Sequence, residues 1–150
     1  MKSLALLVLL LGAAVTATPT QPPILEKAPP NPVTVPTHAP TQSSVPSFTA
    51  EQAQHGQIAF YENCAECHGA RLEGNFGPPL GDTQGNLQWE SVSYVFSYMT
   101  ASMPVGNAGG LRPAEYLDIM AFLLKVHGHA SGAAPLTAAA AIDSKATLGP

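Results

Sequence analysis

Apolar residues recur with a helical period between residues 92 and 99. They occupy positions i, i+3, i+4 and i+7, which lie on one face of a helix. These four positions are Val92, Val95, Phe96 and Met99. Ser91, just before them, is of a residue type that caps helix N-termini. The pattern therefore predicts an amphipathic helix that buries this apolar face.

Two further stretches, residues 50–61 and 113–127, also predict helices. Thr49 and Gln52, three residues apart at the start of the first stretch, have the form of a capping box. The second stretch starts at a proline, which the first helical position tolerates. Arg112 before it is a weak capping residue, so we expect a soft start. Gly128 is a typical residue after a helix end. The chain thus predicts three main helices.

The remaining segments lack this period. Lys2, a short apolar run and small residues up to Ala17 form a predicted signal peptide at residues 1–17. The apolar run is shorter than the roughly 20 residues of a spanning helix, although an uncleaved anchor is an alternative. Nine of the thirty residues at 18–47 are proline, which predicts a disordered, polyproline-like linker. The predicted domain covers residues 48–129, and the tail at 130–150 is expected to be partly ordered, fraying beyond Ile142.

Both cysteines of the chain lie in the pentapeptide C-A-E-C-H, as Cys64 and Cys67, and His68 follows them directly. This spelling is the attachment site of c-type haem. Two thiols at this spacing can form thioethers with the two vinyl groups of one porphyrin. The adjacent imidazole can then bind the iron as its proximal ligand.

A C-x-x-C pair also occurs in thioredoxin-type redox dithiols and in zinc sites. A thioredoxin motif follows a strand, whereas here a helical pattern precedes the pair. A structural zinc site usually takes four closely spaced Cys or His ligands, and the sequence has no second pair. Haem attachment is therefore the preferred interpretation.

A long loop rich in glycine and proline follows the motif. The motif, the stretches L-E-G-N-F-G-P-P-L and M-P, and the helix E-Y-L-D-I-M-A-F-L-L occur in an order that resembles a class I cytochrome c. More narrowly, residues 52–136 resemble the small cytochrome domains and subunits associated with periplasmic quinoprotein alcohol dehydrogenases. The resemblance implies an all-α class I cytochrome c fold, with three main helices and long loops around one covalently bound haem c.

The same resemblance implies roles for further residues. The carbonyl of Pro78 is expected to accept a hydrogen bond from His68, which would fix the ring and raise its basicity. Leu80 is expected to pack on the haem. Trp89 either donates to a haem propionate, as tryptophans near this position do in relatives, or is a core aromatic residue. The last helix should cross the first, so that Ile119 and Phe122 meet Gly56 and Phe60.

Met103 is the expected second iron ligand. Met99 and Met120 lie within apolar helical faces and are expected in the core. Met103 instead stands where the helical period stops, before Pro104, and a residue before proline is pushed toward extended backbone. It also matches the M-P motif of the family. The alternative is an open iron position or a different ligand.

Charged residues make up only 11% of the chain and the formal net charge is −4, so no basic surface indicates nucleic acid. No stable membrane span is expected. His127 and His129 near the end of the last helix are expected to form an exposed pair that complements the helix dipole, rather than a metal site.

These features predict a periplasmic electron-transfer protein rather than an enzyme, possessing one haem c as cofactor. The expected partners are redox proteins: a quinoprotein or other dehydrogenase or a cytochrome complex as donor, and a terminal oxidase or another cytochrome as acceptor. The alternative is a haem-based ligand-binding or sensor module with an open iron position. A small haem peroxidase ranks low, because the chain offers no distal His and Arg pair placed like one.

Overall fold

The computed structural model describes residues 44–81, 85 and 87–149. The predicted signal peptide and nearly all of the predicted proline-rich linker lie outside the described residues. Within the described part, the chain forms five α-helices and a short 3-10 helix, η1 (Leu87–Trp89), but no strand. One isolated β-bridge joins Ser91 and Thr147. The prediction of an all-α architecture is confirmed.

The first helix leads directly into the haem motif. Helix α1 (Ala50–Asn63) begins at Thr49, whose hydroxyl accepts a hydrogen bond from the N–H of Gln52 at 3.1 Å. The short helix α2 (Ala65–His68) follows after a single residue. It ends at Gly69, whose φ of +80° lies in the region that favours glycine.

Helix α3 (Val92–Ser102) buries the predicted apolar face. All four of its periodic apolar residues are buried, and the hydroxyl of Ser91 caps its N-terminus by accepting from the N–H of Tyr94 at 3.1 Å. Helix α4 (Pro113–Val126) starts more firmly than predicted. The Glu115 carboxylate accepts from the backbone N–H of Arg112 at 2.8 Å and from its guanidinium at 3.1 Å. The side chain three residues into the helix therefore compensates for the weak capping residue.

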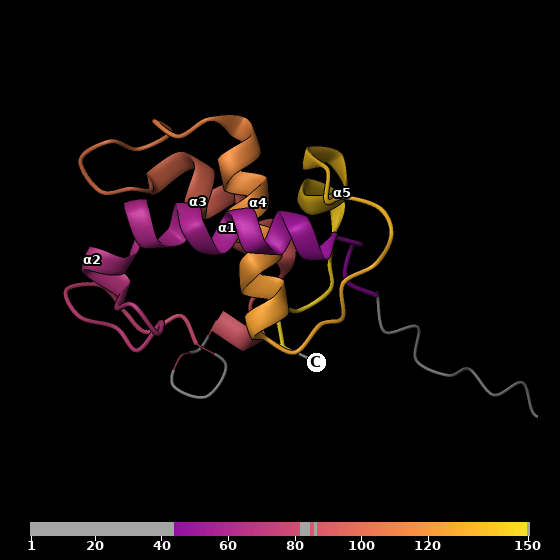
Figure 1. Ribbon diagram of the computed structural model, residues 1–150, viewed down its shortest axis with the longest axis horizontal. Coiled ribbons are helices and arrows are strands. Elements are labelled where there is room, and N and C mark those ends of the chain that lie inside the picture. Colours follow the sequence, from indigo (N-terminus) through magenta and orange to yellow (C-terminus); the bar gives the residue numbers. More distant parts are fainter. Residues whose placement is uncertain (1–43, 82–84, 86, 150) are drawn as a thin grey trace, which may run out of the picture. The chain divides into compact units, whose positions relative to one another are not determined.

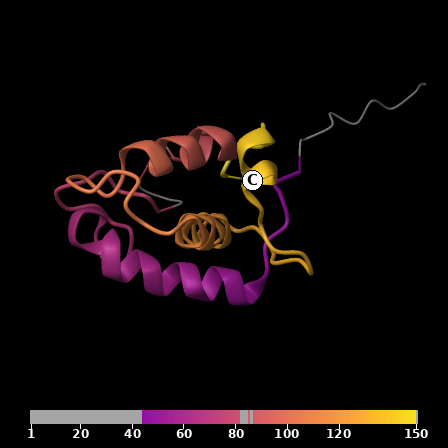
Figure 2. The ribbon, with the colours of Figure 1, turned by 90° about the horizontal axis from the view of Figure 1, so that it is seen from above.

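Helix α4 is the centre of the packing. Figures 1 and 2 together show α1 crossing one side of α4, with α3 on the opposite side. At the crossing, a Cβ added to Gly56 would overlap the backbone carbonyl of Asp118, so only glycine allows this approach. The rings of Phe60 and Phe122 lie 5.5 Å apart at a tilt of 51°. The predicted contact between the first and last helices is confirmed.

The segment after α4 is built into the domain. Helix α5 (Ala138–Asp143) packs against α3, and the side chains of Leu136 and Leu148 are buried. In a complete capping box, the Gln52 side chain would accept a hydrogen bond from the backbone N–H of Thr49. Here the side chain of Gln52 instead forms two hydrogen bonds with the backbone of Leu136, donating to its carbonyl and accepting from its N–H. The expectation of fraying beyond Ile142 is wrong, because residues 144–149 pair through backbone hydrogen bonds with residues 88–93. No hydrophobic period in the sequence predicts this pairing of the two backbone segments.

Two loops lie at the same end of the domain in both ribbon views. Residues 69–81 follow α2, and residues 103–112 follow α3 (Figures 1 and 2). The chain enters α1 at the opposite end. Among the described residues, no helix has the length and hydropathy needed to cross a membrane.

Candidate haem-binding site

The two thiols of the motif lie at the junction of α1 and α2. Cys64 ends α1, donating its backbone N–H to the carbonyl of Phe60 at 2.8 Å, and is also the residue before α2. Cys67 lies within α2, and both cysteines are half-buried free thiols. Burial, with a smaller contribution from neighbouring Cys67, raises the pKa of the Cys64 thiol to about 11. Neither cysteine is in a disulfide, so both sulfurs are available for thioether bonds.

The imidazole of His68 has a defined orientation. Its Nδ1 lies 2.8 Å from the carbonyl oxygen of Pro78, and the side chain is largely buried. A carbonyl can only accept, so this bond places the proton on Nδ1 and leaves the lone pair on Nε2. The sequence-based resemblance assigned this contact to Pro78, and the structure contains it. An oriented imidazole with a free Nε2 lone pair is what an axial iron ligand requires.

The loop after α2 passes directly over this ring. A Cβ at Gly77 would lie 2.8 Å from Cε1 and 2.9 Å from Nδ1 of His68, closer than side chains tolerate. The Gly77 N–H donates to the carbonyl of Cys67 at 2.8 Å, and the Gly74 N–H donates to the carbonyl of His68, also at 2.8 Å. Glycine is thus required at 77 because the backbone must lie against the imidazole, and these bonds hold the loop on α2.

Leu80 and Met103 belong to the two loops at this end of the domain. Both are partly buried against the same core cluster, as is Cys64. Met103 directly follows α3 with extended backbone, φ −120° and ψ 152°, as a residue before proline should. Its side chain therefore leaves the helix end and is not part of the α3 apolar face. Met99 and Met120, by contrast, are buried in the core as predicted.

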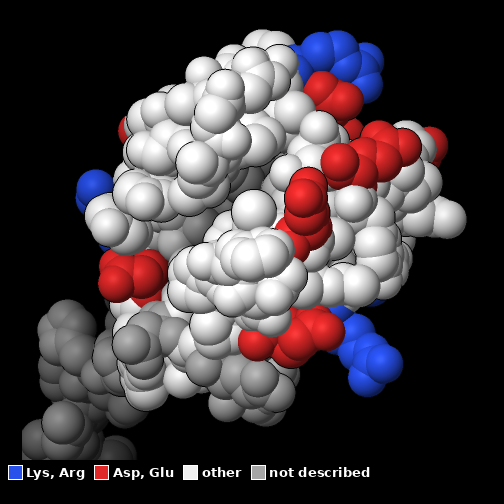
Figure 3. Space-filling view, turned by 90° about the vertical axis from the view of Figure 1, so that its left-hand side faces the viewer, with Lys and Arg blue, Asp and Glu red and all other residues white. Residues whose placement is uncertain are grey.

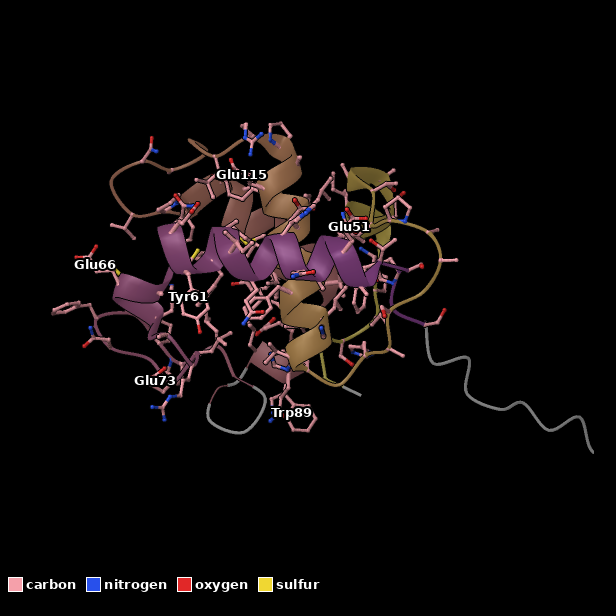
Figure 4. All side chains as sticks on the ribbon, in the orientation of Figure 1. Glu51, Tyr61, Glu66, Glu73, Trp89 and Glu115 are labelled. Atoms are coloured by element: carbon pink, nitrogen blue, oxygen red, sulfur yellow. The ribbon has the colours of Figure 1, made fainter. Side chains whose placement is uncertain are left out.

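Trp89 is not a core residue. It ends η1 and is 73% exposed, so the core-aromatic alternative is wrong. Figure 4 shows it projecting outward below α4. Its assignment to a haem propionate remains a prediction.

The two histidines after α4 are not the exposed pair that the sequence indicates. His127 is buried, and its Nε2 lies 3.1 Å from the carbonyl of Leu80. His129 is half-buried, with Nε2 2.7 Å from the carbonyl of Leu148. His127 therefore ties the end of α4 to the loop after the haem motif. Its position one turn beyond Leu123 and Leu124, on the apolar side of the helix, was the available sequence signal.

Acidic side chains lie on the outside of this region. Figure 4 shows Glu66 on α2 and Glu73 on the loop, both directed away from α1. Backbone N–H groups of Glu73 itself and of Arg71 bind the Glu73 carboxylate, the latter at 2.7 Å, and hold its pKa below the usual value. This carboxylate therefore stabilises the turn of the loop.

The described residues fit a covalently bound haem. The two thiols are free, and the imidazole of His68 has its proton on Nδ1, as an iron ligand through Nε2 requires. Gly77 lets the backbone pass close to this ring, so that the carbonyl of Pro78 can accept the hydrogen bond that orients it. Cys64, Cys67 and His68 would hold such a group, with Met103 as the candidate ligand from the opposite loop. Among the described residues, no group of three or more His, Cys, Asp or Glu side chains could hold a free metal ion.

Comparisons with known proteins give three similarities for parts of this chain. A family model described as cytochrome c oxidase, cbb3-type, subunit III, matches residues 51–123. A cytochrome c-553-like protein of Synechocystis sp. is 35% identical over 72 residues, which cover 47% of this chain and 66% of that protein. The chain thus spans slightly less than two thirds of the length of this curated relative. The crystal structure of the sulfane dehydrogenase SoxCD from Paracoccus pantotrophus aligns at 28% identity with a TM-score of 0.47, covering 59% of this chain and 52% of that chain.

The helical architecture and the family model define the fold class of the domain. It has the all-α class I cytochrome c fold. The family model and the cytochrome c-553-like relative further support a c-type cytochrome, for which haem c is the implied cofactor. This chain is thus similar to a family of cbb3-type oxidase subunits and to a cytochrome c-553-like protein.

Proposed function

We propose that the chain is a periplasmic monohaem c-type cytochrome that carries single electrons between redox proteins. The observation that carries the proposal is the imidazole of His68, oriented by Pro78 and placed directly after two free thiols. The single C-x-x-C-H motif of the sequence supports one haem. The predicted signal peptide at residues 1–17 supports export.

Each residue of the site has a separate task in this proposal. A bound haem c supplies a one-electron couple at its iron. Cys64 and Cys67 would attach the porphyrin, and His68 would offer its Nε2 to the iron. Met103 would offer its thioether as the second ligand, which would raise the reduction potential relative to a nitrogen ligand. Two ligands supplied by the protein would leave little rearrangement to accompany each electron transfer.

The exposed surface near the motif supports transient docking. Phe76 on the loop after α2 is 85% exposed, and Val105 on the loop after α3 is 79% exposed. Figure 3 views the α2 end and shows a broad area without charged side chains beside scattered acidic ones. A small and largely uncharged contact favours short-lived complexes whose affinity depends weakly on salt. Glu66 and Glu73 at its margin favour a basic partner over an acidic one.

The partners are proposed from the sequence and the family. The resemblance to cytochromes of periplasmic quinoprotein alcohol dehydrogenases supports a quinoprotein or other dehydrogenase as donor, with this chain as a free carrier or a subunit. The family model that matches residues 51–123 is named after a terminal oxidase subunit, which supports a terminal oxidase or another cytochrome as acceptor.

A carbon monoxide titration of the reduced haem-loaded protein tests this function. With Met103 on the iron, carbon monoxide should bind weakly and slowly, whereas Met103→Ala should bind it fast and tightly. Met99→Leu is the matched control, because it removes a buried methionine outside the site and should leave binding unchanged. Fast and tight binding by the unaltered protein would contradict the electron carrier and favour the sensor module.

A further inference from the structure

The loop that begins at Met103 is closed by a single side chain from α4. Tyr116 lies in the first turn of α4 and is buried. Its hydroxyl donates to the carbonyl of Met103 at 2.7 Å. The same oxygen accepts from the N–H of Leu111 at 3.4 Å. One phenolic oxygen therefore contacts the backbone near both ends of the loop, at Met103 and at Leu111.

Two other hydrogen bonds inside the loop are short-range backbone ones, from the N–H of Asn107 to the carbonyl of Pro104 and from the N–H of Gly110 to the carbonyl of Asn107, both at 2.9 Å. Gly106 and Gly109 have φ values of +89° and +72°, and a Cβ at Gly106 would meet nothing within 4 Å. Glycine-rich backbone has many accessible conformations, so contacts at the ends of the loop determine how narrowly it is confined. Exposed Val105 contributes no packing.

The backbone of Met103 is held on both sides. Its N–H donates to the carbonyl of Met99 at 3.0 Å, which extends the hydrogen bonding of α3. Its carbonyl accepts from Tyr116 and also from the N–H of Gly109 at 3.2 Å. Fixing both backbone groups of a residue fixes the direction of its Cα–Cβ bond, and the side chain retains only its own rotamers.

The hydroxyl of Tyr116 is explained by these bonds rather than by packing. A phenylalanine would fill the same apolar surroundings, and a buried phenol is stable only when its O–H finds partners. We propose that Tyr116 is a positioning residue, which holds Met103 where its thioether can serve as the second iron ligand. The inference rests on the proposed ligation by Met103, and Tyr116 acts through the backbone without touching the iron.

An imidazole titration of the oxidised haem-loaded protein tests the proposal, because imidazole competes with the methionine. Removing the hydroxyl in Tyr116→Phe should raise the apparent affinity for imidazole roughly tenfold, the effect of one lost hydrogen bond on the methionine-bound population. The absorption band of methionine-ligated oxidised haem should weaken in parallel. Tyr98→Phe is the matched control, because it removes a hydroxyl from an exposed tyrosine on α3 and should change neither quantity.

Amide hydrogen exchange gives a second measurement on the same variants. The N–H of Leu111 should exchange faster in Tyr116→Phe and remain unchanged in Tyr98→Phe. Unchanged imidazole affinity in Tyr116→Phe, with only the unfolding midpoint lowered, would overturn the positioning role and leave the proposed function intact. Absence of the methionine band from the unaltered protein would overturn the ligation by Met103 and the inference with it.

Discussion

At the scale of single residues, the site depends on how closely the backbone can approach the imidazole of His68. The φ of Gly77 is not positive, so a left-handed backbone is not what requires glycine there. What excludes a side chain there is the ring, which is held in place by its bond to Pro78. Steric access rather than backbone freedom therefore explains this glycine.

Gly77→Ala should shift the ring of His68 or the loop, because the added methyl group cannot share its space with a fixed imidazole. We expect a loss of about 1–3 kcal/mol in the free energy of unfolding of the haem-loaded protein. Gly81→Ala is the matched control in the same loop, where the nearest atoms to an added Cβ lie at 3.6 and 3.9 Å. Denaturant unfolding of both variants measures the difference, and equal stabilities would contradict this account of Gly77.

The sequence identified Cys64, Cys67 and His68 because their chemistry is local and lies within one pentapeptide. It did not identify the contacts of Tyr116 and His127, although both lie on apolar helix faces. Their polar atoms bind backbone carbonyls of segments far along the chain, at Met103 and Leu80. These hydrogen-bond partners depend on how the loops fold over α4, and the local sequence pattern does not predict that.

At the scale of elements, the crossing of α1 and α4 fixes the haem motif relative to the core. Helix propensity favours alanine over glycine in a helix interior by about 1 kcal/mol. At Gly56 this gain is outweighed, because a Cβ would overlap the backbone carbonyl of Asp118. The two helices can approach closely only with glycine at this position.

Gly56→Ala should therefore destabilise the protein by about 3 kcal/mol or more, since backbone rather than a flexible side chain must move. Gln57→Ala, at the exposed neighbouring position, should have little effect. Thermal unfolding of the haem-loaded variants compares them. A stabilising effect of Gly56→Ala would mean that propensity decides and that the helices do not cross here.

The C-terminal segment is a second element-scale test. Leu148 is fully buried and its N–H donates to the carbonyl of Glu90 at 2.8 Å, so Leu148→Ala should cost about 2–5 kcal/mol. Ile142→Ala, at a half-exposed position on α5, should cost much less. If both variants unfold at the same denaturant concentration, the segment is not part of the folded domain.

At the scale of the whole molecule, the predicted domain of residues 48–129 is small, and much of it consists of glycine- and proline-rich loops. A core of this size is marginal by itself, and a bound haem would add an apolar centre. The three helices and their apolar faces could be predicted from periodicity. The pairing of residues 144–149 with residues 88–93 could not, because it consists of backbone hydrogen bonds that many sequences could form.

The haem-free chain should be largely unfolded, and alkylation of its thiols provides a sensitive test. In the folded arrangement, burial raises the pKa of Cys64 to about 11 from 9.0, so near neutral pH its thiolate would be roughly a hundredfold scarcer than that of an unperturbed thiol. We expect instead that Cys64 in the haem-free chain reacts as fast as an unfolded model peptide. Because the unfolded thiol ionises first, this group also lowers the stability of any folded haem-free state as the pH rises from 9 to 11.

Slow alkylation of Cys64 that accelerates only near pH 11, together with a helical circular dichroism spectrum, would show that the chain folds without haem. Cys67 in the same sample reports the reactivity of the reagent under each condition.

The intact mass of the protein, purified from a host that attaches c-type haem, tests the central claim most directly. The account predicts that the denatured protein carries the mass of one haem in addition to the polypeptide, and that the Cys64→Ser, Cys67→Ser double variant carries none. A polypeptide without added mass under conditions in which a known c-type cytochrome is loaded would contradict it.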